Sequence, residues 1–195
     1  MWNAPAVPAL LSSSSRGLAG DGFTLIEVLV ALVLLSFGAL GLAGLQASAL
    51  RLNREAQWHT TAVQLARDYA ELIRANPAAH AAYLVAQTDR PTRAPARHCG
   101  QVQCTAQERA AWDAHEWQSR VATTLPTAQW AACTDSAAVD AQGRPRWACT
   151  GSTSAPIAIK IGWRRTPPGK PGAKQEVQAE GPVLVHQVWP RGSPP

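Results

Sequence analysis

Hydrophobic residues are unevenly distributed along this chain, and the longest apolar stretch lies near its N-terminus. Between residues 23 and 45 the only charged side chain is that of Glu27. A helix over these positions spans about 34 Å, which exceeds the roughly 30 Å hydrocarbon core of a bilayer. A helix also pairs its backbone donors and acceptors within one segment, as lipid requires. The pattern therefore predicts a membrane-embedded helix over residues 23–50.

The apolar residues change to a helical period after residue 50. Up to residue 75 they recur on one stripe, and most charged residues lie on the other faces. The stripe consists of Leu52, Ala56, His59, Val63, Ala66, Ala70 and Ile73, widened by Leu65, Tyr69 and Leu72. Asn76-Pro77 predicts the end of the helix, because proline lacks an N–H and disfavours a helical residue before it. Residues 51–76 should therefore continue the helix as an amphipathic half that packs on a globular domain.

Residues 77–195 predict one small head with a second helix. Residues 78–104 carry several prolines and arginines without a clear period, so we expect irregular connecting structure there. Thr105 and Glu108 then form a capping box, which opens a helix that should run to about Thr124. Its expected buried face is Ala110, Ala114, Trp117, Val121 and Leu125.

Short strands are expected after this helix. We predict them at residues 130–133, 147–149, 157–163 and 183–189, with a loop rich in Pro, Gly and Lys at 167–174. Alternation is clearest in the third strand, where one side holds three isoleucines and the other holds Ala158, Lys160 and Gly162. The head also contains most of the eight tryptophans, which we expect mainly in the core or on strand faces.

The four cysteines suit an exported domain in an oxidising compartment. Three pairings are possible, and we favour the local ones, Cys99 with Cys104 and Cys133 with Cys149. The alternative is a zinc site made of His98, Cys99, Cys104 and His115. Its spacing lacks the usual two-residue spacer, and adjacent His98 and Cys99 would strain to bind one ion. We therefore expect disulfides and no metal.

No pattern in the chain predicts catalysis or a cofactor. His115-Glu116 lacks the second histidine of a metalloprotease helix, and there is no phosphate-binding glycine loop and no nucleophile motif. The formal net charge of +5 permits attraction to acidic partners, but the basic residues are dispersed, so we favour a solvated surface over a nucleic-acid site. The sequence thus favours a structural protein rather than an enzyme.

Glu27 is unusual because an acid within a bilayer is costly without a cation, and no Lys or Arg lies between residues 22 and 50. If the chain were cut after Gly22, the new amine of Phe23 would lie at membrane depth, where a neighbouring copy could offer it to Glu27. This pairing would specify a stagger between subunits.

The motif of Gly22, Phe23 and Glu27 before a long apolar helix resembles the class III signal of type IV pilins and pseudopilins. The resemblance implies cleavage after Gly22 by a prepilin peptidase, methylation of Phe23, and a role for Glu27 in filament assembly. It also implies a type IV pilin-like α+β fold, in which a long N-terminal helical stem packs on a small antiparallel β-sheet head.

Residues 1–22 are then a leader peptide, followed by a transmembrane part (23–50), an amphipathic part (51–76) and the head (77–195). Arg16 fits the positive-inside rule, with the head exported to the periplasm from a single-pass inner-membrane anchor before it reaches the pilus and the cell surface. The alternative is an ordinary secretory signal cut after Ala47-Ser48-Ala49. We favour the pilin signal because an ordinary apolar region is shorter, about 7–15 residues, and does not normally carry a glutamate.

A second stretch resembles the minor pilins called type IV pilus modification protein PilV. It is Ala66-Arg67-Asp68-Tyr69-Ala70-Glu71-Leu72-Ile73-Arg74-Ala75-Asn76-Pro77. This resemblance implies a minor pilin that helps initiate, cap or modify a pilus and supports adhesion or twitching motility. Its implied partners are the prepilin peptidase, other minor and major pilins, and the inner-membrane assembly machinery.

Two alternatives remain open: a type II secretion pseudopilin, which shares the first motif, and a pilin whose head binds DNA or a surface. The second would be favoured if the basic residues converged on one face. These residues are Arg90, Arg93, Arg97, Arg164, Arg165, Lys170 and Lys174.

Overall fold

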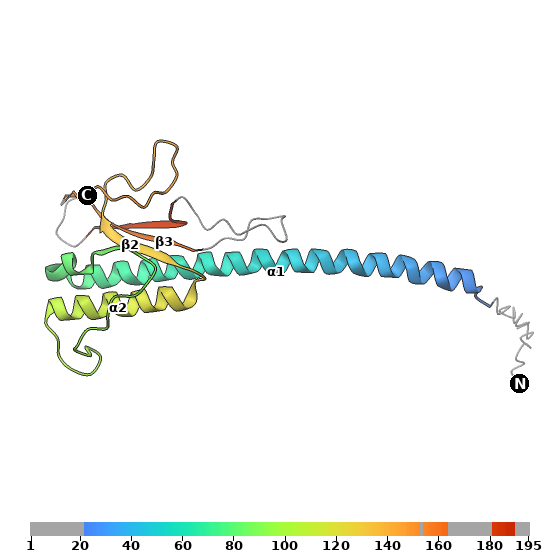
Figure 1. Cartoon of the computed structure of the whole chain (residues 1–195), viewed down its shortest axis with the longest axis horizontal. Helices are drawn as coiled ribbons and strands as arrows, with labels where there is room; N and C mark the ends of the chain where they lie inside the picture. Colours follow the sequence, from blue (N-terminus) through green and yellow to red (C-terminus); the bar gives the residue numbers. More distant parts are fainter. Residues whose placement is uncertain (1–21, 153, 164–180, 190–195) are drawn as a thin grey trace, which may run out of the picture. The chain divides into compact units, whose positions relative to one another are not determined.

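The computed structural model of the chain describes residues 22–152, 154–163 and 181–189. Its elements are α1 (Leu25–Ala75), the 3₁₀ helix η1 (Pro77–Tyr83), β1 (Val85–Thr88), α2 (Ala106–Thr124), β2 (Gln129–Thr134), β3 (Ile157–Gly162) and β4 (Leu184–Val188) (Figure 1). The chain divides into two compact units at Ser48 and Ala49, within α1. The expected leader, apart from Gly22, and the expected loop at 167–174 lie outside the described residues.

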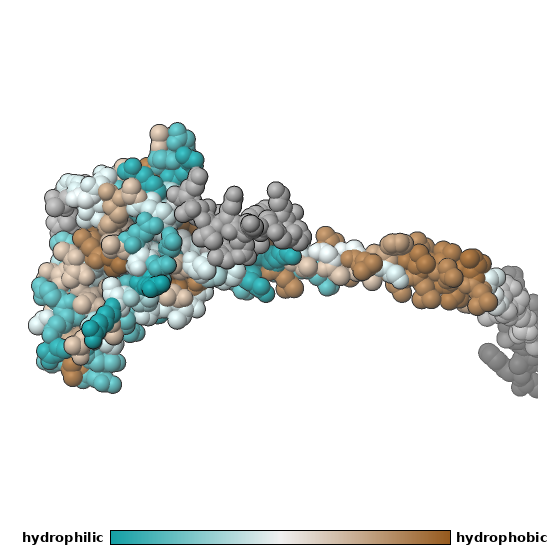
Figure 2. Space-filling model, viewed as in Figure 1, coloured by the Kyte–Doolittle hydropathy of each residue, from teal (hydrophilic) through white to brown (hydrophobic). Residues whose placement is uncertain are grey.

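The first unit, as far as it is described, is the N-terminal part of α1. Every side chain from residue 22 to residue 48 is exposed in the single chain. Figure 2 shows this part of the helix as mostly hydrophobic surface. In the part of the chain that the structure describes, α1 is the one helix long and apolar enough to cross a membrane, with a mean hydropathy of 2.5 in its most apolar window.

The second unit contains a four-stranded antiparallel sheet in the order β1-β2-β3-β4. The central ladder between β2 and β3 runs without interruption from the pair Gln129 and Gly162 to the pair Thr134 and Ile157. Alternate residues of a strand face opposite sides of a sheet, so the three isoleucines of β3 share one face. That face packs on the C-terminal part of α1 and on α2 (Figure 1). The predicted α+β fold, with a long N-terminal helix on a small antiparallel sheet, is confirmed.

Aromatic contacts join the two helices of this unit. The rings of Tyr69 in α1 and Trp117 in α2 stack with their centroids 4.1 Å apart. Trp117 also donates its indole N–H to the backbone oxygen of Leu65 at 2.9 Å, so its one polar group is satisfied in the core. Helix α2 also contacts β2, where the indole N–H of Trp130 donates to the side-chain oxygen of Gln118 at 3.4 Å.

The predicted start and end of α2 and the predicted end of α1 are all found. Thr105 accepts from the amide of Glu108 while Glu108 accepts from the amide of Thr105, which completes the capping box, and α2 ends at Thr124. The five residues of its expected inner face are all buried. Helix α1 ends at Ala75, directly before Asn76-Pro77.

The turn after α1 is joined to α2 by polar side chains. Asn76 donates its amide to the backbone oxygen of Ala106 at 2.8 Å. Tyr83 donates its hydroxyl to a carboxylate oxygen of Asp113 at 2.9 Å, and Tyr69 donates to the backbone oxygen of Tyr83 at 2.7 Å. Asn76 therefore both precedes the proline that ends α1 and bonds to the first residue of α2.

Three details of the sequence interpretation are wrong. Residues 78–104 are not wholly irregular, since they contain η1 and the edge strand β1. The strand expected at 147–149 is absent, and these residues form loop structure instead. The buried stripe of α1 begins later than expected: Leu52 and Ala56 are exposed, and Ala62 is the first fully buried residue. Periodicity alone cannot tell where along a helix its apolar face becomes covered.

Candidate processing and assembly site

Gly22 and Phe23 lie immediately before α1 and are exposed. A Cβ added to Gly22 would have no heavy atom within 4 Å. The fold of the described chain therefore does not require glycine at this position. The Phe23 side chain is 80% exposed, so it contributes nothing to a core within the single chain. Packing among the described residues therefore gives no reason for glycine and phenylalanine at these two positions.

The start of α1 is organised by Thr24. Its hydroxyl accepts from the amide of Glu27 at 3.3 Å, and its carbonyl accepts from the amides of Glu27 and Val28 at 3.1 and 3.2 Å. The carboxylate of Glu27 stands in the first turn, where the helix dipole favours a negative charge. Within residues 22–152, 154–163 and 181–189, no ion pair involves this carboxylate. The structure thus gathers the predicted residues at one helix start and leaves the acid without a cation from the described chain.

Two family models match the chain, and they meet near this helix. The prokaryotic N-terminal methylation motif matches residues 21–43, which contain Gly22, Phe23 and Glu27. The model for type IV pilin Tt1218 matches residues 44–115, from the middle of α1 into α2. Over these two ranges the chain is similar to type IV pilins. No curated protein and no solved structure matches it.

The methylation motif implies processing by a prepilin peptidase and assembly with other pilins. Together with the apolar helix, it indicates membrane anchoring. The pilin family that the second model describes is structural rather than enzymatic.

The four cysteines of the pilin head form two disulfides. Cys99 is bonded to Cys104 and Cys133 to Cys149, the pairings that their spacing favoured. Both sulfur ligands of the alternative zinc site are therefore occupied. Among the residues that the structure describes, no group of three His, Cys, Asp or Glu is placed to hold a metal ion.

The two histidines of that alternative site lie in other surroundings. His98 packs on the ring of Trp112, with the ring centroids 4.2 Å apart. His115 places Nδ1 2.8 Å from the backbone oxygen of Thr92. The two histidines therefore make separate local contacts.

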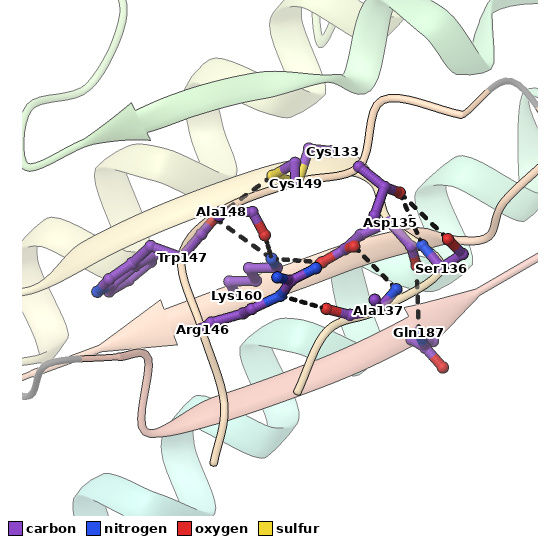
Figure 3. The surroundings of a disulfide bond; sticks show 11 residues. Cys133, Asp135, Ser136, Ala137, Arg146, Trp147, Ala148, Cys149, Lys160 and Gln187 are labelled. Atoms are coloured by element: carbon purple, nitrogen blue, oxygen red, sulfur yellow. Dashed lines mark hydrogen bonds and ion pairs between the residues drawn. A yellow bond between two sulfur atoms is a disulfide. The ribbon is translucent and has the colours of Figure 1, made fainter. Parts of the chain in front are cut away.

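Sequence reasoning missed an ion pair between Lys160 of β3 and Asp135, just after β2. Lys160 Nζ lies 2.6 Å from a carboxylate oxygen of Asp135, and both side chains are 0% exposed. The ammonium also donates to the backbone oxygens of Ala148 at 2.8 Å and Trp147 at 3.3 Å (Figure 3). Three acceptors thus satisfy the three N–H groups of a fully buried ammonium. The sequence did contain a signal for burial of Lys160. On the same face of β3 its neighbours are the small residues Ala158 and Gly162, which leave room for another segment to cover the lysine side chain.

The pair sets the charge state of Asp135. Burial alone would raise the pKa of this carboxyl. The hydrogen bond from Lys160 and the backbone hydrogen bond from Ala137 outweigh it, so the pKa stays below its usual range. A pair of this kind is strongly destabilised when one partner is removed, by about 3–5 kcal/mol, since the other charge remains buried.

Two of the three described basic residues of the expected set lie beside an acid. Arg97 pairs with Glu108 at 3.3 Å, and Arg90 lies 4.0 Å from Asp89. Arg164, Arg165, Lys170 and Lys174 lie outside the described residues, so convergence of the whole set stays untested.

Proposed function

We propose that this chain is a minor pilin that co-assembles through α1 and helps initiate, cap or modify a type IV pilus. In this proposal a prepilin peptidase removes residues 1–22 and Phe23 becomes the methylated N-terminus. The helix anchors the protein once in the inner membrane with its head in the periplasm, until the pilus machinery extracts it together with other minor and major pilins. The pilus then displays the head at the cell surface.

The observation that carries this proposal is the isolated acid in the first turn of an exposed apolar helix. An unpaired acid at the centre of a bilayer costs about 2.5–3.5 kcal/mol on insertion scales. No Lys or Arg lies between residues 22 and 50 to offset that cost. The amine of Phe23 from a neighbouring subunit would supply the missing cation at the same depth. The pairing would also fix the stagger between adjacent helices.

The minor-pilin role is supported by the stretch from Ala66 to Pro77, which resembles the PilV minor pilins. In the structure this stretch packs against α2, because Tyr69 stacks on Trp117 and Asn76 donates a hydrogen bond to the start of α2. A type II secretion pseudopilin would share the N-terminal motif and would need the same Glu27. Identification of the subunits that co-purify with sheared filaments distinguishes the two appendages.

Substitution of Glu27 tests the proposal. Glu27→Ala removes a costly acid, so the protein should insert and be processed as well as wild type. It loses the partner of a neighbouring amine, which typically costs about 3–5 kcal/mol in a buried pair. We therefore expect normal membrane levels and strong loss from the sheared-filament fraction, with Glu27→Gln intermediate because it keeps an acceptor.

Glu116→Ala provides a matched control, because it removes an exposed acid from α2. It should enter filaments like wild type. If Glu27→Ala protein also entered filaments as efficiently as wild type, the assembly role would be wrong. Glu27 would then act in membrane insertion or in recognition by the peptidase.

A further inference from the structure

The segment between β2 and β3 covers the outer face of the sheet. We call residues 135–150 the strap. Trp147 packs against β3, since a Cβ added to Gly162 would come within 2.8 Å of the Trp147 ring. The strap also supplies all three acceptors of the Lys160 ammonium (Figure 3). The strap thus buries a face of β3 that neither α1 nor α2 covers.

The strap has its own internal hydrogen bonds. Asp140 accepts from the amides of Gln142 and Arg144 at 2.9 and 2.8 Å and pairs with the Arg144 side chain at 2.9 Å. Arg146 donates its amide to Ala138 at 3.1 Å and its Nε to Ala137 at 2.5 Å. These bonds stay within the strap. Apart from the bonds of Lys160, its hydrogen bonds to neighbouring described segments lie at its first residue, where the Asp135 amide donates to Pro156 at 2.9 Å and Gln187 donates to the Asp135 carbonyl at 3.4 Å. The rest of the strap can therefore move away from the sheet without losing its internal bonds.

One covalent bond ties the far end of the strap to the sheet. Cys149 lies next to Ala148, whose carbonyl binds Lys160, and it is bonded to Cys133 at the end of β2. Of the disulfide that holds the strap, Cys149 is exposed and Cys133 half-buried; of the other, Cys104 is half-buried and Cys99 is 4% exposed. A dissolved thiol therefore reaches the disulfide that holds the strap more easily than the other.

We propose that the strap is a redox-controlled cover, closed over Lys160 when the Cys133–Cys149 disulfide forms and opened when it is reduced. On closing, the two thiols lose two protons and pass two electrons to a donor disulfide, which takes up two protons and becomes a dithiol. A dithiol reductant reverses the reaction. Without the tether, hydration of the two ions favours the open form, since burying ions is costly unless their partners are held in place.

Opening is local because the sheet does not depend on the strap for its main core. The isoleucines of β3 face α1 and α2, on the side opposite Lys160. The ladder between β2 and β3 involves residues 129–134 and 157–162, none of which belongs to the strap. In a reducing cytoplasm the strap would stay open and Lys160 would be hydrated. Closure would follow export, and this biological timing rests on the proposed function, whereas the redox control of the strap does not.

Amine acylation of the full chain in detergent micelles tests the cover. The chain has three lysines, and acetylation by an N-hydroxysuccinimide ester is measured for each by peptide mass spectrometry. In the oxidised protein Lys160 should be at least tenfold less acetylated than after treatment with dithiothreitol. Cys133→Ser/Cys149→Ser should be acetylated at Lys160 without reductant. The matched control Cys99→Ser/Cys104→Ser should keep Lys160 protected, and Lys170 and Lys174 provide the reference for reagent activity.

Hydrogen exchange on the same samples separates opening from unfolding. Amides of residues 137–150 should exchange faster in Cys133→Ser/Cys149→Ser, while amides of residues 157–161 keep their protection. Equal protection of Lys160 in this variant and in wild type would overturn the proposal, because the ion pair alone would then hold the strap. Loss of protection in β3 together with the strap would also overturn it, because the strap would not be a separate unit. Neither outcome depends on whether the chain assembles into a pilus.

Discussion

Two acids show how differently the two units of this chain are built. Asp135 in the head is fully buried, and its cation, Lys160, is supplied by the adjacent strand of the same chain at 2.6 Å. Glu27 lies in an apolar helix whose side chains are exposed, and residues 22–50 contain no Lys or Arg. The head therefore supplies a cation for its buried acid, whereas the described N-terminal helix supplies none for Glu27.

The same contrast holds for apolar side chains. In the head, the isoleucines of β3 are buried against α1 and α2. From residue 25 to residue 48, large apolar residues are not covered by the rest of the described chain. Surface of this kind requires lipid or other helices around it. The comparison indicates that the head is complete as a folded unit, and that the N-terminal helix acquires its partners from its surroundings.

The largest effect in the head is expected for Lys160→Met, which leaves Asp135 buried without a cation. The free energy of unfolding should fall by about 3–5 kcal/mol. Urea titration of the full chain in detergent, followed by tryptophan fluorescence, measures it. The double variant Asp135→Leu/Lys160→Met should recover most of the loss, because no lone charge remains. A single variant as stable as wild type would mean that the pair is not buried in solution.

Truncating one apolar residue in each unit tests the contrast directly. Ile159 is 0% exposed and Leu34 is 66% exposed. Ile159→Ala should destabilise the head by about 2–5 kcal/mol, because it removes buried methyl groups and leaves a cavity. Leu34→Ala should leave the urea midpoint of the head unchanged. If both variants shifted the midpoint equally, the two units would not be energetically separate.

The local signals in the sequence predicted much of this fold. Asn76-Pro77 and the capping box of Thr105 and Glu108 act through neighbouring backbone groups, so their effects could be read from a few residues. The motif from Gly22 to Glu27 was recognisable for the same reason. In the structure this motif forms the start of α1, where the Glu27 amide donates a hydrogen bond to the Thr24 hydroxyl.

Features that depend on distant residues could not be predicted in this way. Strand β1 is four residues long and is stabilised by pairing with β2, more than 40 positions later in the chain. Trp147 and its neighbours resemble a strand in composition, yet two of their carbonyls bind Lys160 instead of another strand. Alternation placed Lys160 opposite the isoleucines, and its small neighbours Ala158 and Gly162 left room for a cover, but no local pattern identified residues 135–150 as that cover.

A smaller effect is expected at the connection between α1 and α2. Asn76→Ala removes the donor to the backbone oxygen of Ala106, a bond of 2.8 Å at a partly buried site. The loss should be about 0.5–1.5 kcal/mol by urea titration. Gln107→Ala, an exposed change at the start of α2, should be near neutral. An Asn76→Ala variant indistinguishable from this control would show that proline alone fixes the turn.

The smallest effect concerns Asp113, which is half-buried. Burial raises the pKa of Asp113, and the hydrogen bond from Tyr83 and the charge of Arg109 offset this only in part. A raised carboxyl pKa means that the ionised form opposes folding above the usual carboxyl range. Asp113→Asn keeps an acceptor for Tyr83, so it should stabilise the head slightly at pH 7. This gain should disappear as the pH falls below about 4. Urea titrations of Asp113→Asn and wild type at pH 7 and pH 3.5 measure this gain. A gain that is the same at both pH values would contradict a raised pKa of Asp113.

The mature N-terminus tests the central claim most directly. If the chain is processed as a pilin, mass spectrometry of protein purified from the membrane and from filaments should find N-methylated Phe23 as the first residue. Gly22→Ala should be cut more readily than a bulky replacement at the same position, because both are tolerated by the fold and only the peptidase distinguishes them. Leu50 at the N-terminus would instead mean cleavage as an ordinary secretory signal, and it would contradict the account of an anchored, co-assembling pilin.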